Sequence, residues 1–216
     1  DIPNLVHFLR PNSKVLIIGA GGGRDILSAL TFEQPSITAI ELNEAIIEIV
    51  NGTFGEFKGH LDQLPQVTLV HDEARSWIAR QEQKFDIIQA SWIDTWAATA
   101  AGAFVLTENS LYTVEAWQSF LQHLNPGGVI TFTRNFNAER PAEATRVVAL
   151  AREALRSIGV TDTRRHILLA LNQPRGLAVV EGNATILVSP QPFTDGDVAR
   201  FREVTSNLQF GIGTAP

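Results

Sequence analysis

The 216-residue sequence predicts a single α/β domain, residues 1–216, with a seven-stranded and mostly parallel sheet covered by helices on both faces. Apolar runs typical of buried strands alternate with stretches whose apolar residues recur at helical spacing. The first run leads into a glycine-rich turn, as a parallel strand does before its crossover helix. Turn residues near 176 and 181–183 separate the last two runs, which predicts a C-terminal antiparallel hairpin at one edge.

The strands are placed by the apolar runs. The run KVLIIG begins at Lys14, and the run ITAI ends at an acid, Glu41. The seven predicted strands lie near residues 14–19, 37–41, 67–71, 86–90, 128–133, 166–172 and 184–189.

Helices are predicted between these strands from capping residues and helical periodicity. One helix, near residues 25–30, follows the glycine turn. The next is expected to begin at Asn43, to turn Ile46, Ile47 and Val50 inward, and to end at Gly52. Three more are predicted from a Thr113 cap to about 124, over 142–158, and from a Thr194 cap towards 208.

The composition argues against several classes of function. A formal net charge of −6 gives no electrostatic footprint for nucleic acid. The absence of cysteine excludes disulfides and thiolate chemistry, and the five histidines lack metal-ligand spacing, so no metal site is expected. With no bilayer-spanning run and no signal peptide, a cytoplasmic location is expected. Because methionine is absent even at position 1, we expect the chain to be an excised or processed segment.

The glycine turn and Glu41 together predict a nucleoside site. Gly19, Gly21 and Gly23 let the backbone turn off a strand and bring its N–H groups against a ligand, and the following helix points its positive end at the same place. Glu41, at the tip of the neighbouring strand, is placed to accept hydrogen bonds from both ribose hydroxyls. The alternative is a tight turn without a ligand.

The glycine spacing favours one class of nucleoside. A dinucleotide fingerprint needs a small residue where this chain has Arg24. The G-x-G-x-G spacing found here resembles that of the class I transferases that bind S-adenosylmethionine, and their Rossmann-like class I methyltransferase fold is therefore expected. Arg24 suits a carboxylate, which S-adenosylmethionine has and its decarboxylated form lacks. Alternatively, Arg24 forms a structural pair with Asp25 or Glu41.

Two later strand ends add candidates, because ligands lie beyond the carboxyl ends of such strands. After the third strand come Asp72, Glu73 and Ala74, where an acid can accept a hydrogen bond from an adenine amino group. After the fourth come candidates for chemistry and for an acceptor pocket, namely Gln89, Ser91, Trp92, Asp94 and Thr95. The alternatives are that Asp72 or Glu73 only caps the next helix, that Asp94 caps a turn, and that Trp92 belongs to the core.

Residues 14–134 resemble the catalytic domain of the spermidine synthase family of aminopropyltransferases. The resemblance rests on the segments VLIIGAGGG, AIELN, PQVTLVHDEARSWI, FDIIQASWID and LTENSLYTVEAWQSFLQHLNPGGVITF. It implies a transferase in which Asp94 orients or deprotonates the acceptor, with Tyr112 in the acceptor pocket and the loop 92–105 closing over it. Other segments, such as GGGRDILSAL and DTWAATAAGAF, are similar to synthase-like domains of bacterial multi-spanning membrane proteins.

The chain departs from that family pattern at two acids. Gly22 stands where the synthases have an aspartate for the propylamine end of the donor, and Ser91 stands where they have the aspartate that deprotonates the amine. A serine hydroxyl is no general base without an activating partner. Only about a dozen residues precede the first strand, so we expect the amino-terminal β domain of the synthases to be lacking from this chain.

Two functions follow. The first is a transferase that binds S-adenosylmethionine, or its decarboxylated form, and moves a methyl or aminopropyl group to a small-molecule acceptor. The second is a nucleoside-binding regulatory domain without chemistry that serves a membrane protein. Contact with or fusion to a membrane domain, and a homodimer, are left open. A nucleic-acid methyltransferase is disfavoured by the acidic balance and by the lack of an Asn/Asp-Pro-Pro-Tyr element after the fourth strand.

Overall fold

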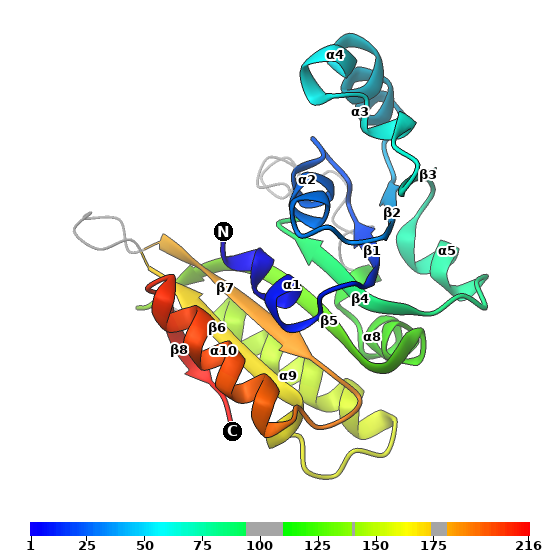
Figure 1. Cartoon of the computed structure of the whole chain (residues 1–216). Coiled ribbons are helices and arrows are strands. Elements are labelled where there is room, and N and C mark those ends of the chain that lie inside the picture. Colours follow the sequence, from blue (N-terminus) through cyan, green and yellow to red (C-terminus); the bar gives the residue numbers. More distant parts are fainter. Residues whose placement is uncertain (94–109, 140, 174–180) are drawn as a thin grey trace.

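The computed structural model describes residues 1–93, 110–139, 141–173 and 181–216. These residues form one twisted sheet and the helices that cover it (Figure 1). The strand order in this described part is β3-β2-β1-β4-β5-β7-β6-β8. The strands from β3 to β5 are parallel, and the pairings of β7, β6 and β8 are antiparallel. The strands are β1 Lys14–Ile18, β2 Ser36–Glu41, β3 Val67–His71, β4 Phe85–Ser91, β5 Leu124–Asn137, β6 Ile167–Asn172, β7 Glu181–Val188 and β8 Gly211–Thr214.

Helices cover both faces of this sheet, and Figure 1 shows α9 and α10 on opposite sides of it. The α-helices are α1 Leu5–Leu9, α2 Arg24–Thr31, α3 Glu44–Glu48, α4 Gly55–Lys58, α5 Ala74–Ala79, α8 Val114–Gln122, α9 Ala142–Ser157 and α10 Asp195–Asn207. Shorter 3-10 turns are η1 Ile2–Asn4, η3 Leu61–Gln63, η4 Ser110–Tyr112 and η5 Arg164–His166, and η2 Ile49–Thr53 is a π-helix. No helix in the described ranges is both long and apolar enough to cross a bilayer.

Two apolar layers hold the helices to the sheet. On one face α5, α8 and α9 pack on a core that includes Trp117, Phe120 and Phe132. On the other, α1, α2 and α10 pack on a core that includes Ile26 and Phe201. Because parallel strands are buried on both faces, they carry the continuous apolar runs that made them predictable.

The expected fold class is confirmed, with an additional strand. The prediction of seven strands was wrong by one, because β8 pairs with the edge of β6. Its sequence, Gly-Ile-Gly-Thr, has no apolar run that would announce a strand. The predicted N-caps Asn43, Thr113 and Thr194 each accept a backbone N–H, and Thr194 forms a reciprocal capping box with Asp197.

The segment after β2 differs from the prediction. The helix does not end at Gly52 but continues through the π-helical η2 and into α4, and Figure 1 shows this unit standing away from the sheet. The three residues expected to face inward, Ile46, Ile47 and Val50, are therefore only half-buried. Phe57, on α4, is 83% exposed.

Candidate functional site

The glycine turn folds as a left-handed loop at the end of β1. Gly19, Gly21 and Gly23 have φ values of +79°, +49° and +84°, a region that side chains with a Cβ rarely adopt. A Cβ at Gly19 would lie 2.9 Å from the side chain of Ile93. Gly23 is the N-cap of α2, so the loop delivers the chain directly into the helix that follows. The helix amide dipoles consequently point back at the loop.

Glu41 joins this loop to the end of β2. Its side chain is only 8% exposed. Oε2 accepts the N–H of Gly21 at 2.8 Å, and Oε1 accepts the N–H of Asn43 at 3.0 Å. A carboxylate oxygen can accept about two hydrogen bonds, so each oxygen keeps room for a hydroxyl donor. The loop and the acid, 20 residues apart in the sequence, thus form one unit.

A cavity of about 860 Å³ opens above this unit at the carboxyl ends of β1, β2, β3 and β4. This volume lies within the range of natural small-molecule sites. The structure brings most of the predicted ligand-binding residues to its wall. Those that line it are Gly19, Gly21, Arg24, Glu41, Asp72, Glu73 and Ala74. Gly23 does not line it, because this glycine turns the chain into α2 behind the wall.

Arg24 and Trp92 form a stacked pair at one side of the cavity. The Arg24 guanidinium lies 4.0 Å from the centre of the Trp92 ring and 3.0 Å from a carboxylate oxygen of Asp25. The pairing with Asp25 that the sequence offered as an alternative therefore exists. The Arg24 side chain is nevertheless 46% exposed and lines the cavity, so donors of its guanidinium are available to a ligand anion.

Trp92 is itself held from two directions. Its backbone is left-handed, with φ +47°, and its N–H donates to Thr133 O at 3.1 Å. Its indole N–H donates to Oδ1 of Asn183, on β7, at 2.9 Å. The predicted placement of Trp92 beside the cavity agrees with the structure, and the same ring contacts the antiparallel half of the sheet.

The two acids after β3 have structural partners of their own. Glu73 is the N-cap of α5 and accepts the N–H groups of Arg75 and Ser76, as its capping alternative predicted. Asp72 pairs with Arg80 through one oxygen and accepts the Glu73 N–H through the other. Both residues nevertheless line the cavity.

The residues predicted for catalysis and for the acceptor pocket do not all lie at the cavity. Ser91 lines the cavity, and its Oγ accepts a long hydrogen bond of 3.4 Å from the amide nitrogen of Gln89. An amide donor cannot activate a serine hydroxyl. Tyr112 is half-buried against Phe132 and Arg134 and does not line the cavity. Asp94 and Thr95, with the rest of the loop up to residue 105, lie outside the described residues.

Gln89 is fully buried and also does not line the cavity. It lies near His7 of α1, whose Nδ1 is 3.2 Å from the amide nitrogen of Gln34. Burial lowers the pKa of His7 to about 4, against a smaller opposing effect from the Gln89 amide, which raises it. His7 is therefore neutral at physiological pH and helps to fix α1 beneath the sheet.

Several apolar residues complete the cavity wall, although the sequence did not predict them as site residues. They are Ile18, Ala20, Ile40, Leu42, Ile46, Ile93 and Leu111. Leu42 and Ile93 each follow a predicted site residue directly, so extending each motif by one residue would have found them. Apolar walls with a few convergent polar groups are usual for small-molecule sites.

Comparisons with known proteins identify one family over most of the chain. A family model described as the spermine/spermidine synthase domain matches residues 1–163. A polyamine aminopropyltransferase of Korarchaeum cryptofilum is 26% identical over 161 residues, which cover 69% of this chain and 47% of that protein. One from Corynebacterium efficiens is 32% identical over 116 residues, covering 52% of this chain and 21% of that protein. The chain thus spans about half the length, or less, of these curated relatives.

Solved structures share the fold. A probable spermidine synthase from Corynebacterium glutamicum superposes with a TM-score of 0.67 at 17% identity, covering 99% of this chain and 70% of that one. An rRNA methylase from Streptococcus thermophilus superposes with a TM-score of 0.55 at 13% identity, covering 88% of this chain and 95% of that one. At such identities the likeness establishes the Rossmann-like methyltransferase fold.

Proposed function

The chain belongs to the spermine/spermidine synthase family, and from this premise we propose that it is a transferase acting on the adenosyl donor that its cavity fits. The donor is S-adenosylmethionine or its decarboxylated form, and the acceptor is a small molecule. One observation carries the proposal: the left-handed glycine loop and the buried Glu41 carboxylate are hydrogen-bonded to each other at the mouth of a cavity of about 860 Å³.

The residues fit the adenosyl group. Gly19 and Gly21 form a cradle without Cβ atoms, and Glu41 has an unused lone pair on each oxygen for the ribose hydroxyls. Asp72 is proposed to accept from the adenine amino group, with Leu42 and Ala74 beside the base. When bound, the sulfonium donor supplies an activated alkyl carbon. The protein then contributes positioning and exclusion of water, which can supply much of a rate enhancement.

The acceptor side is proposed to lie near Ser91 and Trp92, at the end of β4. Ser91 shapes the pocket and is not expected to remove a proton, because its contact is with an amide. The proposed base is Asp94, with Thr95 beside it, both outside the described residues. Trp92, fixed by Asn183, would form the wall against which the acceptor is held.

Calorimetric titration tests the proposal. Methylthioadenosine, S-adenosylmethionine and decarboxylated S-adenosylmethionine are titrated separately, and we expect at least one micromolar ligand among them. Arg24→Gln distinguishes the two donors: it should weaken the carboxylate-bearing donor about tenfold and leave the decarboxylated donor unchanged. If none of the three ligands binds, the proposal fails.

A second function, a regulatory domain that binds the nucleoside without chemistry, is favoured by the contacts of the cavity acids. Asp25, Asp72 and Glu73 are each engaged by a guanidinium or by helix amides, and Ser91 has no activating partner among the described residues. Such a domain would report the ligand to a partner, which we propose to be a membrane domain or a second copy. Binding without transfer to any of a panel of amines would favour this function.

A further inference from the structure

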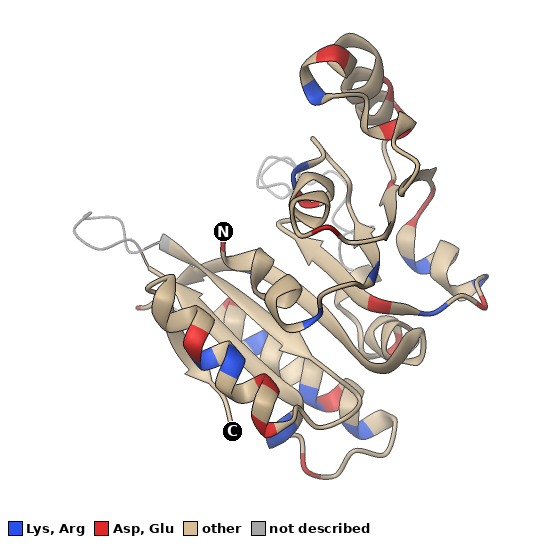
Figure 2. Cartoon of the chain, in the orientation of Figure 1, with Lys and Arg blue, Asp and Glu red and all other residues tan. Residues whose placement is uncertain are grey.

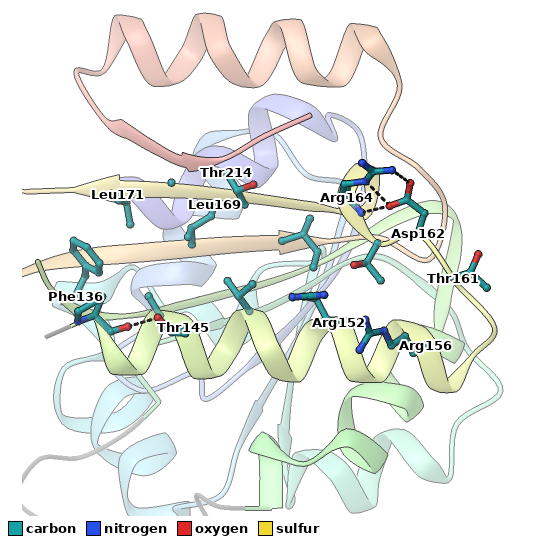
Figure 3. Close-up of a pocket in the computed structure, with 16 residues that line it drawn as sticks. Phe136, Thr145, Arg152, Arg156, Thr161, Asp162, Arg164, Leu169, Leu171 and Thr214 are labelled. Atoms are coloured by element: carbon teal, nitrogen blue, oxygen red, sulfur yellow. Dashed lines mark hydrogen bonds and ion pairs between the residues drawn. The ribbon is translucent and has the colours of Figure 1, made fainter.

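A second cavity, of about 830 Å³, lies at the opposite end of the sheet and shares no lining residue with the first. It is bounded by α9 on one side and by β6 and β8 on the other (Figure 3). α9 packs chiefly over β5 and β7, so the same face of β6 and β8 extends beyond it. The proposed transferase function does not use this space.

The floor of the cavity is apolar because of strand alternation. Ile167, Leu169 and Leu171 are successive odd positions of β6 and face the same side of the sheet. Val148 of α9 and Phe136 of β5 extend this surface. Gly213 of β8 keeps it open, since a Cβ there would lie 2.7 Å from the Leu169 side chain.

One end of the cavity is cationic. Arg152 and Arg156 lie one turn apart on α9, and Arg164 approaches from the loop before β6; Figure 3 shows all three at the end away from Phe136 and Leu171. Arg164 is neutralised by Asp162 at 2.6 Å, and Arg156 is 3.5 Å from Glu153. Arg152 has no ion pair or hydrogen bond with any residue that the structure describes.

The excess of positive charge in this cavity contrasts with the chain as a whole, which carries a net charge of −6. Figure 2 shows acidic and basic residues mixed along α9 and α10, whereas the lining of this cavity holds three arginines and a single carboxylate, Asp162. An apolar floor that ends at the guanidinium of Arg152, which has no counter-ion among the described residues, complements a molecule with an apolar body and an anionic head.

We propose that this cavity binds a small amphipathic anion, with its carboxylate or phosphate head at Arg152 and its hydrocarbon body over Leu169, Leu171 and Phe136. The volume matches a ligand of small-molecule size. A guanidinium binds either head in the same two-pronged way, so the head group is identified by experiment.

The test compares amphiphilic probes that share one decyl-length hydrocarbon tail and differ in their head group. Sodium decanoate, decyl phosphate, decanol and decyltrimethylammonium are titrated calorimetrically into the full chain, below their micelle concentrations. We expect saturable binding of decanoate or decyl phosphate with one site, about tenfold or more over decanol, and no binding of the cationic probe. A preference for decanoate indicates a free acid, and one for decyl phosphate indicates a phosphate-bearing lipid.

Arg152→Gln is the informative variant, and Arg146→Gln is its matched control. Both residues are exposed on α9, but only Arg152 lines the cavity. Arg152→Gln should weaken the anionic probe about tenfold without changing decanol binding, methylthioadenosine binding or the melting temperature. Arg146→Gln should change none of them.

Three results would overturn the proposal: equal affinity for decanoate and decanol, unchanged anion binding in Arg152→Gln, or no saturable binding at all. Sedimentation adds a fourth. If the chain self-associates, and if Arg152→Gln abolishes the association while no amphiphile binds, then a second copy covers the cavity. If none of the three adenosyl ligands binds the wild-type chain, only the transferase proposal is contradicted, because the two cavities share no lining residue.

Discussion

Replacing Glu41 with Gln tests the link between the glycine loop and β2 before any ligand is added. The Glu41 carboxylate accepts two backbone N–H groups, one on each oxygen, from Gly21 and Asn43. Glutamine has nearly the same shape but only one carbonyl oxygen. Whichever way the amide is turned, its NH2 group faces one of the two backbone donors.

The cost follows from these contacts. Losing a hydrogen bond to a charged acceptor and leaving a buried N–H unsatisfied costs about 1–3 kcal/mol. Glu41 is only 8% exposed, so water does not compensate the lost contact fully. We therefore expect the free energy of unfolding to fall by about 2 kcal/mol in the ligand-free protein. Affinity for methylthioadenosine should fall about tenfold or more, because the ribose hydroxyls lose a charged acceptor.

Urea denaturation without ligand measures the first effect, and calorimetry with methylthioadenosine measures the second. Glu44→Gln is the control: Glu44 also lines the cavity, but its side chain is 68% exposed and its partner His71 is 3.9 Å away. The control should stay within about 0.5 kcal/mol of the wild type. If Glu41→Gln is as stable as Glu44→Gln, the two backbone contacts do not hold the loop and the reasoning is refuted.

Two further predictions concern stability. Burial lowers the pKa of His7 to about 4, below the unfolded value of about 6.5, so the unfolded chain binds a proton at His7 more readily than the folded chain does. The free energy of unfolding is therefore highest above pH 6.5 and falls by about 3 kcal/mol as the pH is lowered towards 4. Urea titrations across that window should show a steeper decline for the wild type than for His7→Gln, and equal slopes would contradict the assignment. Gly23→Ala should cost about 2 kcal/mol or more, and Gly21→Ala about 1 kcal/mol, because both have positive φ but only a Cβ on Gly23 meets Leu61, at 2.5 Å. Thermal unfolding of the two variants side by side checks the order, which a reversed ranking would disprove.

The sequence predicted the sheet well where strands are buried on both faces. The runs that became β1, β2 and β4 are mostly apolar, and they lead to residues that line the cavity, namely Gly19, Glu41 and Ser91. It missed β8, since Gly-Ile-Gly-Thr forms a strand only through pairing with β6. It also assigned an inward face to the segment after Asn43, where the helical unit stands away from the sheet and leaves Ile46, Ile47 and Val50 only half-buried.

At the site, the sequence could not show which side chains a distant segment covers. Gln89 and Ser91 are on the same face of β4, yet only Ser91 reaches the cavity, because α1 brings His7 against Gln89. Similarly, the three glycines share a motif but not a role: two line the cavity and Gly23 caps α2. Such differences depend on which distant segment covers a residue, and this information is absent from local sequence.

The indole of Trp92 ties the cavity to a partner 91 residues away, Asn183 on β7. The family match ends at residue 163, before β6 and β7 begin. A recombinant fragment trimmed to that boundary would retain every glycine of the turn and also Glu41, yet its tryptophan would have lost the amide that orients it, and β5 would present an open edge to neighbouring molecules. Expression for functional work should therefore extend through the last strand.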